Sequence, residues 1–403
     1  MTPQLRFSEF SDKWNYIKYN DIFSFYTTNS FSRDKLNYKK GKVKNIHYGD
    51  IHTKFSVLFD INKELVPFIN EDVDISKIKQ GNYCKEGDLV IADASEDYND
   101  VGKTIEIVNL GKDIVIAGLH TFLARPKKNM VALGFTGYLL QSWNVRKQVM
   151  TIAQGSKVLG LSYNRLGEIN LTISSIPEQQ KIASFLTAVD TKITQLKHKK
   201  ELLAQYKKGV MQQIFNQEIC FKDDEGNEYP KWKVKLLGDI CEINKGKQLN
   251  TEFLTKKGLY PCISGGINPS GYTKDYNRIE NTITISEGGN SCGFVNFFTT
   301  KFWCGGHCYA IENLKNDIVG NNFLYQILKY REIKIMRLRV GSGLPNIQKK
   351  DIHKFKIVIP NSIEEQTKIA NFLSAIDTKI KYVDTQLEKT KTFKKGLLQQ
   401  LFV

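Results

Sequence analysis

Two short segments of the chain contain residue types that could do chemistry. Cys304 and Cys308 flank His307 in the segment CGGHC, and thiolates with an imidazole can bind zinc or supply a nucleophile. This spacing matches no common C-x₂-C pair, so buried free cysteines are the simpler interpretation, and a zinc or thiol enzyme centred on His307 is the alternative. Gly102-Lys103-Thr104 resembles the end of a phosphate-binding loop, but Asp97 stands where that loop needs its first glycine. We therefore predict no catalytic residue and no metal site.

Other catalytic and membrane functions lack their required segments. An adenine methyltransferase needs an Asp/Asn-Pro-Pro-aromatic loop, and none of the nine prolines adjoins another. No apolar run approaches the roughly 18 to 20 residues needed to cross a bilayer. The first residues lack a secretory signal, and the seven cysteines are an odd number, so we expect a cytoplasmic protein without disulfides.

The charge balance favours a polyanionic partner. Lys and Arg total 58 against 42 Asp and Glu, which gives a net charge of +16. Double-stranded DNA is the first candidate, although charge alone also fits a merely well-solvated surface.

Phosphate contacts require basic side chains, hydroxyl groups and exposed backbone amides, whereas base edges are read mainly by Arg, Lys, Asn and Gln. Solvated surface and hairpin tips are the alternative interpretation of such residues. In the first half of the chain the candidates for DNA binding are Lys39, Lys40, Lys42, Lys44, His47, Tyr48, His52, Ser95, Ser156, Lys157, Tyr163, Asn164 and Arg165. In the second half they are Lys245, Lys247, Gly289, Asn290, Ser291, Ser342, Asn346 and Gln348.

An internal repeat indicates how these residues are positioned. The segment PEQQKIASFLTAVDTKI at 177–193 returns as EEQTKIANFLSAIDTKI at 364–380, and KKGVMQQIF at 207–215 returns as KKGLLQQLF at 394–402. Both matches have the same offset of 187 residues, so the repeat contains no gap. Upstream, Gly155-Ser156 and Gly341-Ser342 occupy equivalent places. We predict recognition domains at 1–176 and 217–360, each followed by a helix, at 177–216 and 361–403.

Each predicted helix carries an apolar stripe with alternating spacings of four and three. Such a seam packs on another helix, and the order domain, helix, domain, helix favours an antiparallel pair. Lys200 and Lys207 interrupt the first seam, and Thr390 and Lys394 the second, so we expect weaker pairing there. A helix of 38 residues is about 57 Å long, enough to separate two DNA-reading domains. The seam residues are Ile182, Leu186, Val189, Ile193 and Leu196 in the first helix, and Ile369, Leu373, Ile376, Ile380 and Val383 in the second.

The paired EQ-x-KIA-x-FL and KKG-x-x-QQ-x-F segments resemble those of the specificity subunit of type I restriction-modification systems. The resemblance covers essentially the whole chain. It implies a mixed α/β fold with two target-recognition domains, each reading half of a bipartite DNA site, and an antiparallel coiled coil as the spacer.

The resemblance also implies partners. Two methyltransferase subunits would bind this chain, and endonuclease/translocase subunits would join them. S-adenosylmethionine, ATP and Mg²⁺ would be used by those partners, and we expect no cofactor in this chain. The alternative is a noncatalytic coiled-coil adaptor without sequence-specific DNA binding.

Overall fold

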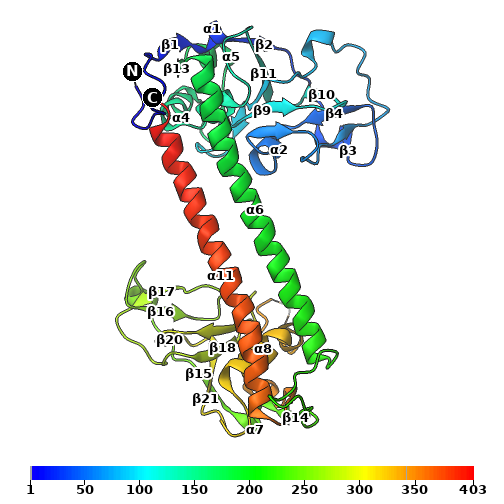
Figure 1. The fold of residues 1–403 in the computed structure, drawn as a ribbon, viewed down its shortest axis with the longest axis vertical. Helices are drawn as coiled ribbons and strands as arrows, with labels where there is room; N and C mark the ends of the chain where they lie inside the picture. The colour runs from blue at the N-terminus through cyan, green and yellow to red at the C-terminus, as the bar shows by residue number, and fades with distance from the viewer. Residues whose placement is uncertain (1, 342) are drawn as a thin grey trace. The chain divides into compact units, whose positions relative to one another are not determined.

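The computed structural model describes residues 2–341 and 343–403, and the chain divides into two compact units (Figure 1). Unit 1 comprises Met1–Lys197 with Thr385–Val403, and unit 2 comprises His198–Asp384. Each unit contains one α/β domain and a part of both long helices. The boundaries differ from the predicted division because the long helices have no core of their own and bury their apolar faces in the cores of both units. The predicted mixed α/β fold class is confirmed.

Unit 1 is built on a five-stranded sheet of order β2-β11-β7-β9-β5, with a second sheet of order β10-β4-β6-β3 and the pairs β1-β13 and β12-β8. Its short helices are α1 (Tyr19–Ile22), α2 (Tyr48–Thr53), α3 (Phe135–Leu139), α4 (Trp143–Ile152) and α5 (Tyr163–Gly167). Its strands are β1 (Asn15–Lys18), β2 (Phe23–Tyr26), β3 (Leu36–Asn37), β4 (Val43–Ile46), β5 (Leu58–Asp60), β6 (Phe68–Ile69), β7 (Leu89–Ala92), β8 (Ala94–Ser95), β9 (Thr104–Asn109), β10 (Ile114–Ala117), β11 (Thr121–Pro126), β12 (Leu159–Gly160) and β13 (Asn170–Ile173).

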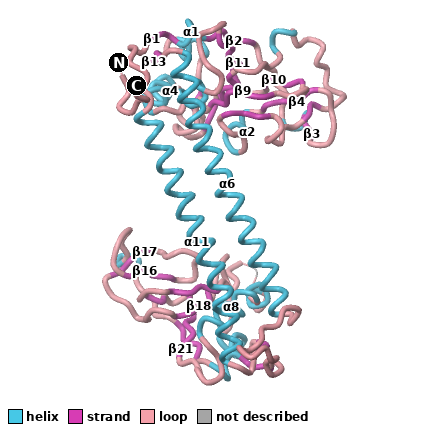
Figure 2. The backbone as a smooth tube through the Cα atoms, in the orientation of Figure 1, coloured by secondary structure: helices cyan, strands magenta, loops and turns pink. Residues whose placement is uncertain are grey.

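Unit 2 is built on a four-stranded sheet of order β15-β21-β18-β19, with a three-stranded sheet of order β17-β16-β20 and the pair β14-β22 (Figure 2). Its short helices are α7 (Leu237–Ile240), α8 (Asn321–Tyr330), α9 (Glu332–Met336) and α10 (Lys349–His353). Its strands are β14 (Lys233–Leu236), β15 (Glu242–Lys245), β16 (Tyr260–Ile263), β17 (Gly271–Thr273), β18 (Thr282–Ser286), β19 (Val295–Phe298), β20 (Trp303–Cys304), β21 (Cys308–Glu312) and β22 (Lys356–Ile359). Every residue of β7 and of β18 is buried, as expected for central strands.

The two long helices are α6 (Ile176–Phe215) and α11 (Ile363–Gln400). Both begin with acidic residues in the first turn, which favours the helix dipole. At α11 the hydroxyl of Ser362 accepts the backbone N–H of Glu365 at 3.3 Å and caps the helix. Within the described part of the chain, neither these nor the other helices combine the length and apolar character needed to cross a membrane.

The repeated Glu-Gln pair joins each long helix to its domain. Trp14 Nε1 donates to Glu178 at 3.2 Å, and Trp232 Nε1 donates to Glu365 at 3.0 Å. The neighbouring glutamines are also bonded equivalently: Gln179 accepts the Ala132 N–H and Gln366 accepts the Gly320 N–H, while both amides donate to backbone carbonyls. The Glu-Gln pair of the repeated motif therefore fixes the start of each helix against its domain.

The predicted seam residues lie on the faces where the long helices pack. In unit 1, Ile182, Leu186 and Val189 share a core with Leu397 and Leu401 of α11. In unit 2, the core combines the end of α6 with the start of α11, and Leu196 and Val383 are also buried. Its members from these helices are Val210, Met211, Ile214, Phe215, Ile369, Ala370, Leu373 and Ile376, with Ile380 partly buried against them, as Ile193 is in unit 1.

The lysines that interrupt the seams have partners on the opposite helix. Lys394 Nζ lies 2.7 Å from a carboxylate oxygen of Asp190 within unit 1, and Lys207 Nζ lies 2.7 Å from Asp377 within unit 2. The two pairs are equivalent under the 187-residue repeat. The lysine side chains are only 16% and 12% exposed, so water screens them little. The expectation of weaker pairing at these lysines was therefore wrong, because it considered their missing apolar area and not their partners.

A third ion pair, between Lys200 and Asp384 in unit 2, uses the same register. In all three pairs the residue numbers add up to 584, which is the pattern of antiparallel helices. A shift by one heptad in one direction would place Lys394 opposite Lys197, and a shift in the other direction would place it opposite Ala183. Either shift leaves a half-buried lysine without its carboxylate, so charge specifies this register.

We predict that reversing the charge of Lys394 destabilises the helix pair. Lys394→Asp places two carboxylates together and should cost about 1 to 3 kcal/mol, since the pair is partly shielded from solvent. Adding Asp190→Lys should restore most of the loss in thermal unfolding. Lys391→Asp is the control, because exposed Lys391 pairs with Glu388 of its own helix. Equal losses for Lys391→Asp and Lys394→Asp would contradict the proposed role of the pair.

A buried carboxylate in unit 1 supports the same junction from the domain side. Glu106 of β9 is 1% exposed and accepts the N–H groups of Gly134 and Gly137 at 2.6 and 2.7 Å. These amides belong to the start of α3, whose Tyr138 hydroxyl donates to Asp190 at 2.9 Å. Burial raises the pKa of Glu106 to about 7, while the hydrogen bonds from the two glycine amides oppose the rise.

The raised pKa of Glu106 predicts a pH dependence. The folded chain holds the Glu106 proton more tightly than the unfolded chain, so this contribution to stability is complete below about pH 4.5 and is lost as the pH rises to about 7. The loss is at most about 3 kcal/mol. In denaturant unfolding, Glu106→Gln should flatten the pH profile in this window, whereas Glu96→Gln, at an exposed position, should not. An unchanged slope in Glu106→Gln would contradict the assignment.

Candidate nucleic-acid interface

An acid–histidine pair lies at the end of the central strand in each domain. In unit 1, β7 leads into Asp93, whose carboxylate lies 3.2 Å from His120 Nδ1, and the Asp93 N–H donates to the His120 carbonyl at 3.1 Å. In unit 2, β18 leads into Glu287, whose carboxylate lies 3.8 Å from His307 Nδ1, and the Glu287 N–H donates to the His307 carbonyl at 2.9 Å. Burial raises the pKa of Asp93 above its usual value, while His120 opposes this rise. Both imidazoles are exposed.

A hairpin with a glycine in its turn adjoins each pair. Gln154 and Gly160 exchange backbone hydrogen bonds of 3.0 and 2.7 Å, and Val340 and Asn346 exchange bonds of 2.9 and 3.0 Å. Gly155 has a φ of 134°, and a Cβ there would lie 1.9 Å from the Val158 carbonyl oxygen. This turn therefore requires glycine.

Backbone bonds hold both hairpins to the strand ends. The Leu161 N–H donates to the Asp93 carbonyl at 2.8 Å, and the Ile347 N–H donates to the Glu287 carbonyl at 2.9 Å. In unit 1 the contact extends into the β12–β8 pairing of Leu159 with Ser95. Each hairpin is thus fixed at its base and presents its turn to solvent.

In unit 1, helix α2 adds aromatic rings to the pair. The Tyr48 ring lies 4.7 Å from that of His47, 5.9 Å from that of His52 and 5.3 Å from that of His120. Burial lowers the pKa of His47 to about 4, helped by the charge of Arg33, so His47 is neutral at pH 7. Its Nδ1 accepts the Gly49 N–H at 3.2 Å. His47 therefore orders the start of α2, while Tyr48 and His52 stand beside the exposed His120.

In unit 2, Lys245 supplies a positive charge at the pair. Its ammonium lies 2.6 Å from Glu287, which also accepts the buried Tyr309 hydroxyl at 3.0 Å. Gly289 donates its N–H to the Pro345 carbonyl at 3.0 Å and so joins the strand-end turn to the hairpin. Gln348 follows the hairpin and donates to the Asn346 side chain at 3.1 Å, and exposed Lys247, Asn290 and Ser291 lie on the adjoining turns, Ser291 being half-buried.

The structure therefore brings together some of the predicted residues. In unit 1 these are His47, Tyr48, His52, Ser95, Ser156 and Lys157, and in unit 2 they are Lys245, Gly289, Asn346 and Gln348. Their contact with DNA stays a prediction.

Other predicted residues lie apart from the pairs or are already engaged. Lys39, Lys40, Lys42 and Lys44 lie on and beside β3 and β4, where Lys44 is bound to Asp113 and Lys40 to Glu71. Tyr163, Asn164 and Arg165 lie on α5, where the Tyr163 ring contacts that of Phe122. Ser342 lies outside the described residues.

The sequence analysis gave His120 no role and assigned His307 to a different one. The segments AGLHTF at 117–122 and CGGHCY at 304–309 share the 187-residue offset, and this similarity could have identified both histidines. Cys304 and Cys308 are buried, whereas His307 faces Glu287 at the surface. Among residues 2–341 and 343–403, no group of three or more His, Cys, Asp and Glu side chains is placed to hold a metal ion.

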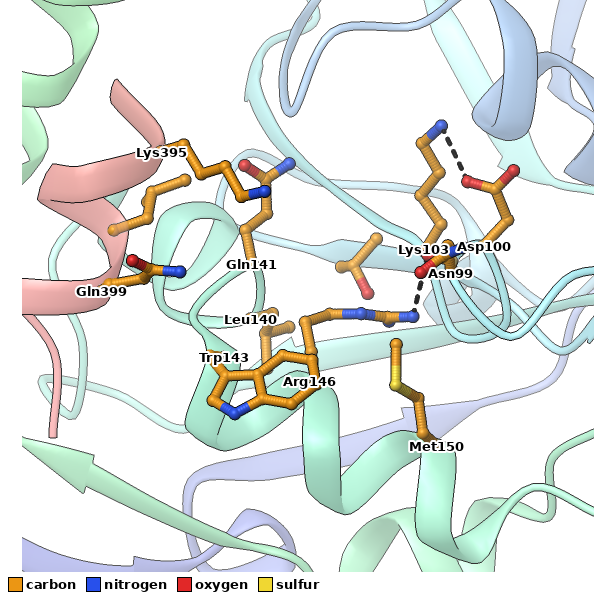
Figure 3. A pocket seen from close by; sticks show the side chains of 12 residues that line it. Asn99, Asp100, Lys103, Leu140, Gln141, Trp143, Arg146, Met150, Lys395 and Gln399 are labelled. Carbon is orange, nitrogen blue, oxygen red and sulfur yellow. Dashed lines mark hydrogen bonds and ion pairs between the residues drawn. The ribbon is translucent and has the colours of Figure 1, made fainter. Parts of the chain in front are cut away.

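The resemblance of Gly102-Lys103-Thr104 to a phosphate-binding loop leads to a pocket in unit 1 (Figure 3). The Lys103 ammonium is bound to Asp100 at 3.3 Å and to the His52 carbonyl at 2.6 Å. Arg146, also in this pocket, donates to the backbone carbonyls of residues 98, 99 and 101. Both cations are thus used within the protein, and the exposed Trp143 ring lines the pocket beside them.

The chain is similar over nearly its whole length to known proteins. It is 26% identical to the putative type I restriction enzyme MjaX specificity subunit of Methanocaldococcus jannaschii, over 98% of this chain and 93% of that protein. It is 33% identical over 176 residues to a putative type I specificity subunit of Mycoplasma pneumoniae and 28% identical over 176 residues to one of Mycoplasma genitalium. The chain spans about half the length of these two Mycoplasma relatives, 47% and 46%.

Solved structures share the fold. The crystal structure of the type I restriction-modification system S subunit from M. genitalium matches with a TM-score of 0.67 and 17% identity, over 100% of this chain and 99% of that one. A chain from a study of complex assembly and conformational transition of the type I system matches with a TM-score of 0.52 and 14% identity, over 96% and 97%.

The family model described as type I restriction modification DNA specificity domain matches residues 11–205 and 229–391, which include both domains and most of both long helices. The chain therefore belongs to the family of type I restriction-modification DNA specificity proteins.

Proposed function

We propose that this chain is the DNA sequence-specificity subunit of a type I restriction-modification complex and catalyses no reaction itself. The observation that carries the proposal is the duplicated surface, in which each domain presents an acid–histidine pair and an anchored hairpin with exposed polar residues. Such loops on a rigid sheet suit DNA contacts, because backbone amides and basic groups hold phosphates while nearby side chains reach base edges. Each domain would read one half of a bipartite site.

The partners in this proposal are two methyltransferase subunits held by the chain, with endonuclease/translocase subunits joining them in the cytoplasm. S-adenosylmethionine, ATP and Mg²⁺ would serve those partners. The net charge of +16 supports a polyanionic ligand, and the family membership supports DNA as that ligand. A coiled-coil adaptor that binds only proteins is the competing function.

DNA binding is tested by its salt dependence. The affinity of the assembled complex for duplex DNA should fall log-linearly with salt, because each neutralised phosphate releases counterions. Lys157→Ala should reduce the slope by about one and weaken all sequences alike. Sequencing methylated bases in cells with and without this chain should identify one split adenine-methylated motif. Salt-independent retention, or no motif that depends on the chain, would favour the adaptor.

The helix pair is proposed to set the gap between the two half-sites. Seven residues inserted in heptad register after Lys197 in α6 and after Asp384 in α11 would lengthen both helices by about 10 Å, which is about three base pairs. These positions leave all three interhelical ion pairs within their units. Base sequencing should show the same half-sites with a longer gap. A changed half-site sequence, or an unchanged gap with full methylation, would contradict the spacer role.

A further inference from the structure

We propose that Val158 and Leu344 enter a groove of the DNA as apolar hairpin tips and contact base edges, each in its own half-site. This inference rests on the proposed function and names side chains that would determine base preference within it. A branched aliphatic side chain cannot bond to phosphate. It can contact a thymine methyl group or pack against a partly unstacked base step.

The two residues occupy equivalent positions in the two domains. They are 186 residues apart, as are the hairpin-closing residues Gln154 and Val340 and the turn glycines Gly155 and Gly341. The same type of side chain thus recurs at the same point of the same hairpin, although the surrounding sequences have diverged. A recurrence of this kind argues against a chance surface residue.

Exposure separates the tips from the side chains that stabilise the hairpins. Val158 is 53% exposed and Leu344 is 87% exposed, whereas Leu159 and Ile347 beside them are buried. The buried neighbours hold each hairpin to its domain. The exposed tips add nothing to those cores and present apolar surface to water, which favours their burial in a ligand.

The anchoring of the hairpins suits insertion. Both are closed by two backbone hydrogen bonds and are fixed to the carbonyls of Asp93 and Glu287, so little order would be lost on binding. In unit 1, exposed Lys157 precedes the tip and can neutralise a phosphate at the groove edge. In unit 2, Gly343 takes that place, so the larger Leu344 projects without a neighbouring charge. The two tips should therefore prefer different base pairs.

The test uses the complete methyltransferase complex carrying Val158→Ala or Leu344→Ala. Sequencing of methylated bases should show that Leu344→Ala relaxes discrimination about tenfold at one position of one half-site only, and that Val158→Ala does so in the other half-site. The salt slope of DNA binding should stay unchanged in both, because an apolar contact releases no counterion, in contrast to Lys157→Ala. Thermal unfolding should be unaltered, since both side chains are exposed.

The matched controls are Leu259→Ala and Leu65→Ala, at leucines that are 76% and 70% exposed in loops before β16 and β6. These variants should leave both half-sites unchanged. If the wild-type complex binds DNA with the expected salt dependence but neither tip variant alters a half-site, the inference is wrong while the proposed function stands. Relaxation of both half-sites by one tip, or by a control leucine, would also overturn it. If the wild-type complex shows no salt-dependent binding, the proposed function itself fails.

Discussion

The pairing of lysines with aspartates between the two long helices is the constraint on which the structure depends. An apolar seam alone tolerates several registers, because leucine, isoleucine and valine pack against one another in many combinations. Lys207 and Lys394 remove that freedom, since each is mostly buried and has its carboxylate only in one register. The aspartates also accept hydrogen bonds from the domains, through Tyr138 in unit 1 and Gln326 in unit 2. One carboxylate in each unit thus links both helices and the domain.

Much of this arrangement follows from the sequence because the helices are repeated without a gap. The apolar spacing predicts α6 and α11 to within a few residues, and Glu178 and Gln179 recur as Glu365 and Gln366 because both copies need the same anchor to the domain. The ion pairs were not predicted. The lysines were visible as interruptions of the seam, but their partners depend on the register, which only the folded structure provides.

The candidate interface was less predictable for a physical reason. Its residues come from strand ends, turns and hairpins separated by up to about seventy positions, and long-range backbone bonds bring them together. Ser156, Lys157, Asn346 and Gln348 could be chosen from composition and from the repeated Gly-Ser. Lys40 and Lys44 satisfied the same criterion of charge, yet the structure pairs them with Glu71 and Asp113. Composition identifies groups that can bind phosphate and cannot tell which of them are already neutralised.

The residue offsets between the two domains indicate where their surfaces differ. Trp14 and Trp232 are 218 residues apart, whereas Asp93 and Glu287 are 194 apart, so unit 1 contains 24 more residues between these landmarks. This interval includes α2 and the strands β3, β4 and β6.

The additional segment changes the chemistry around the pair. It places Tyr48 and His52 beside His120, whereas in unit 2 Lys245 takes a position against Glu287. The common skeleton of strand end, histidine and anchored hairpin is therefore equipped with aromatic and imidazole groups in one domain and with a primary ammonium in the other. Because hydrogen-bonding pattern and charge decide which base edges a surface can accept, the two domains are suited to different half-sites despite their common origin.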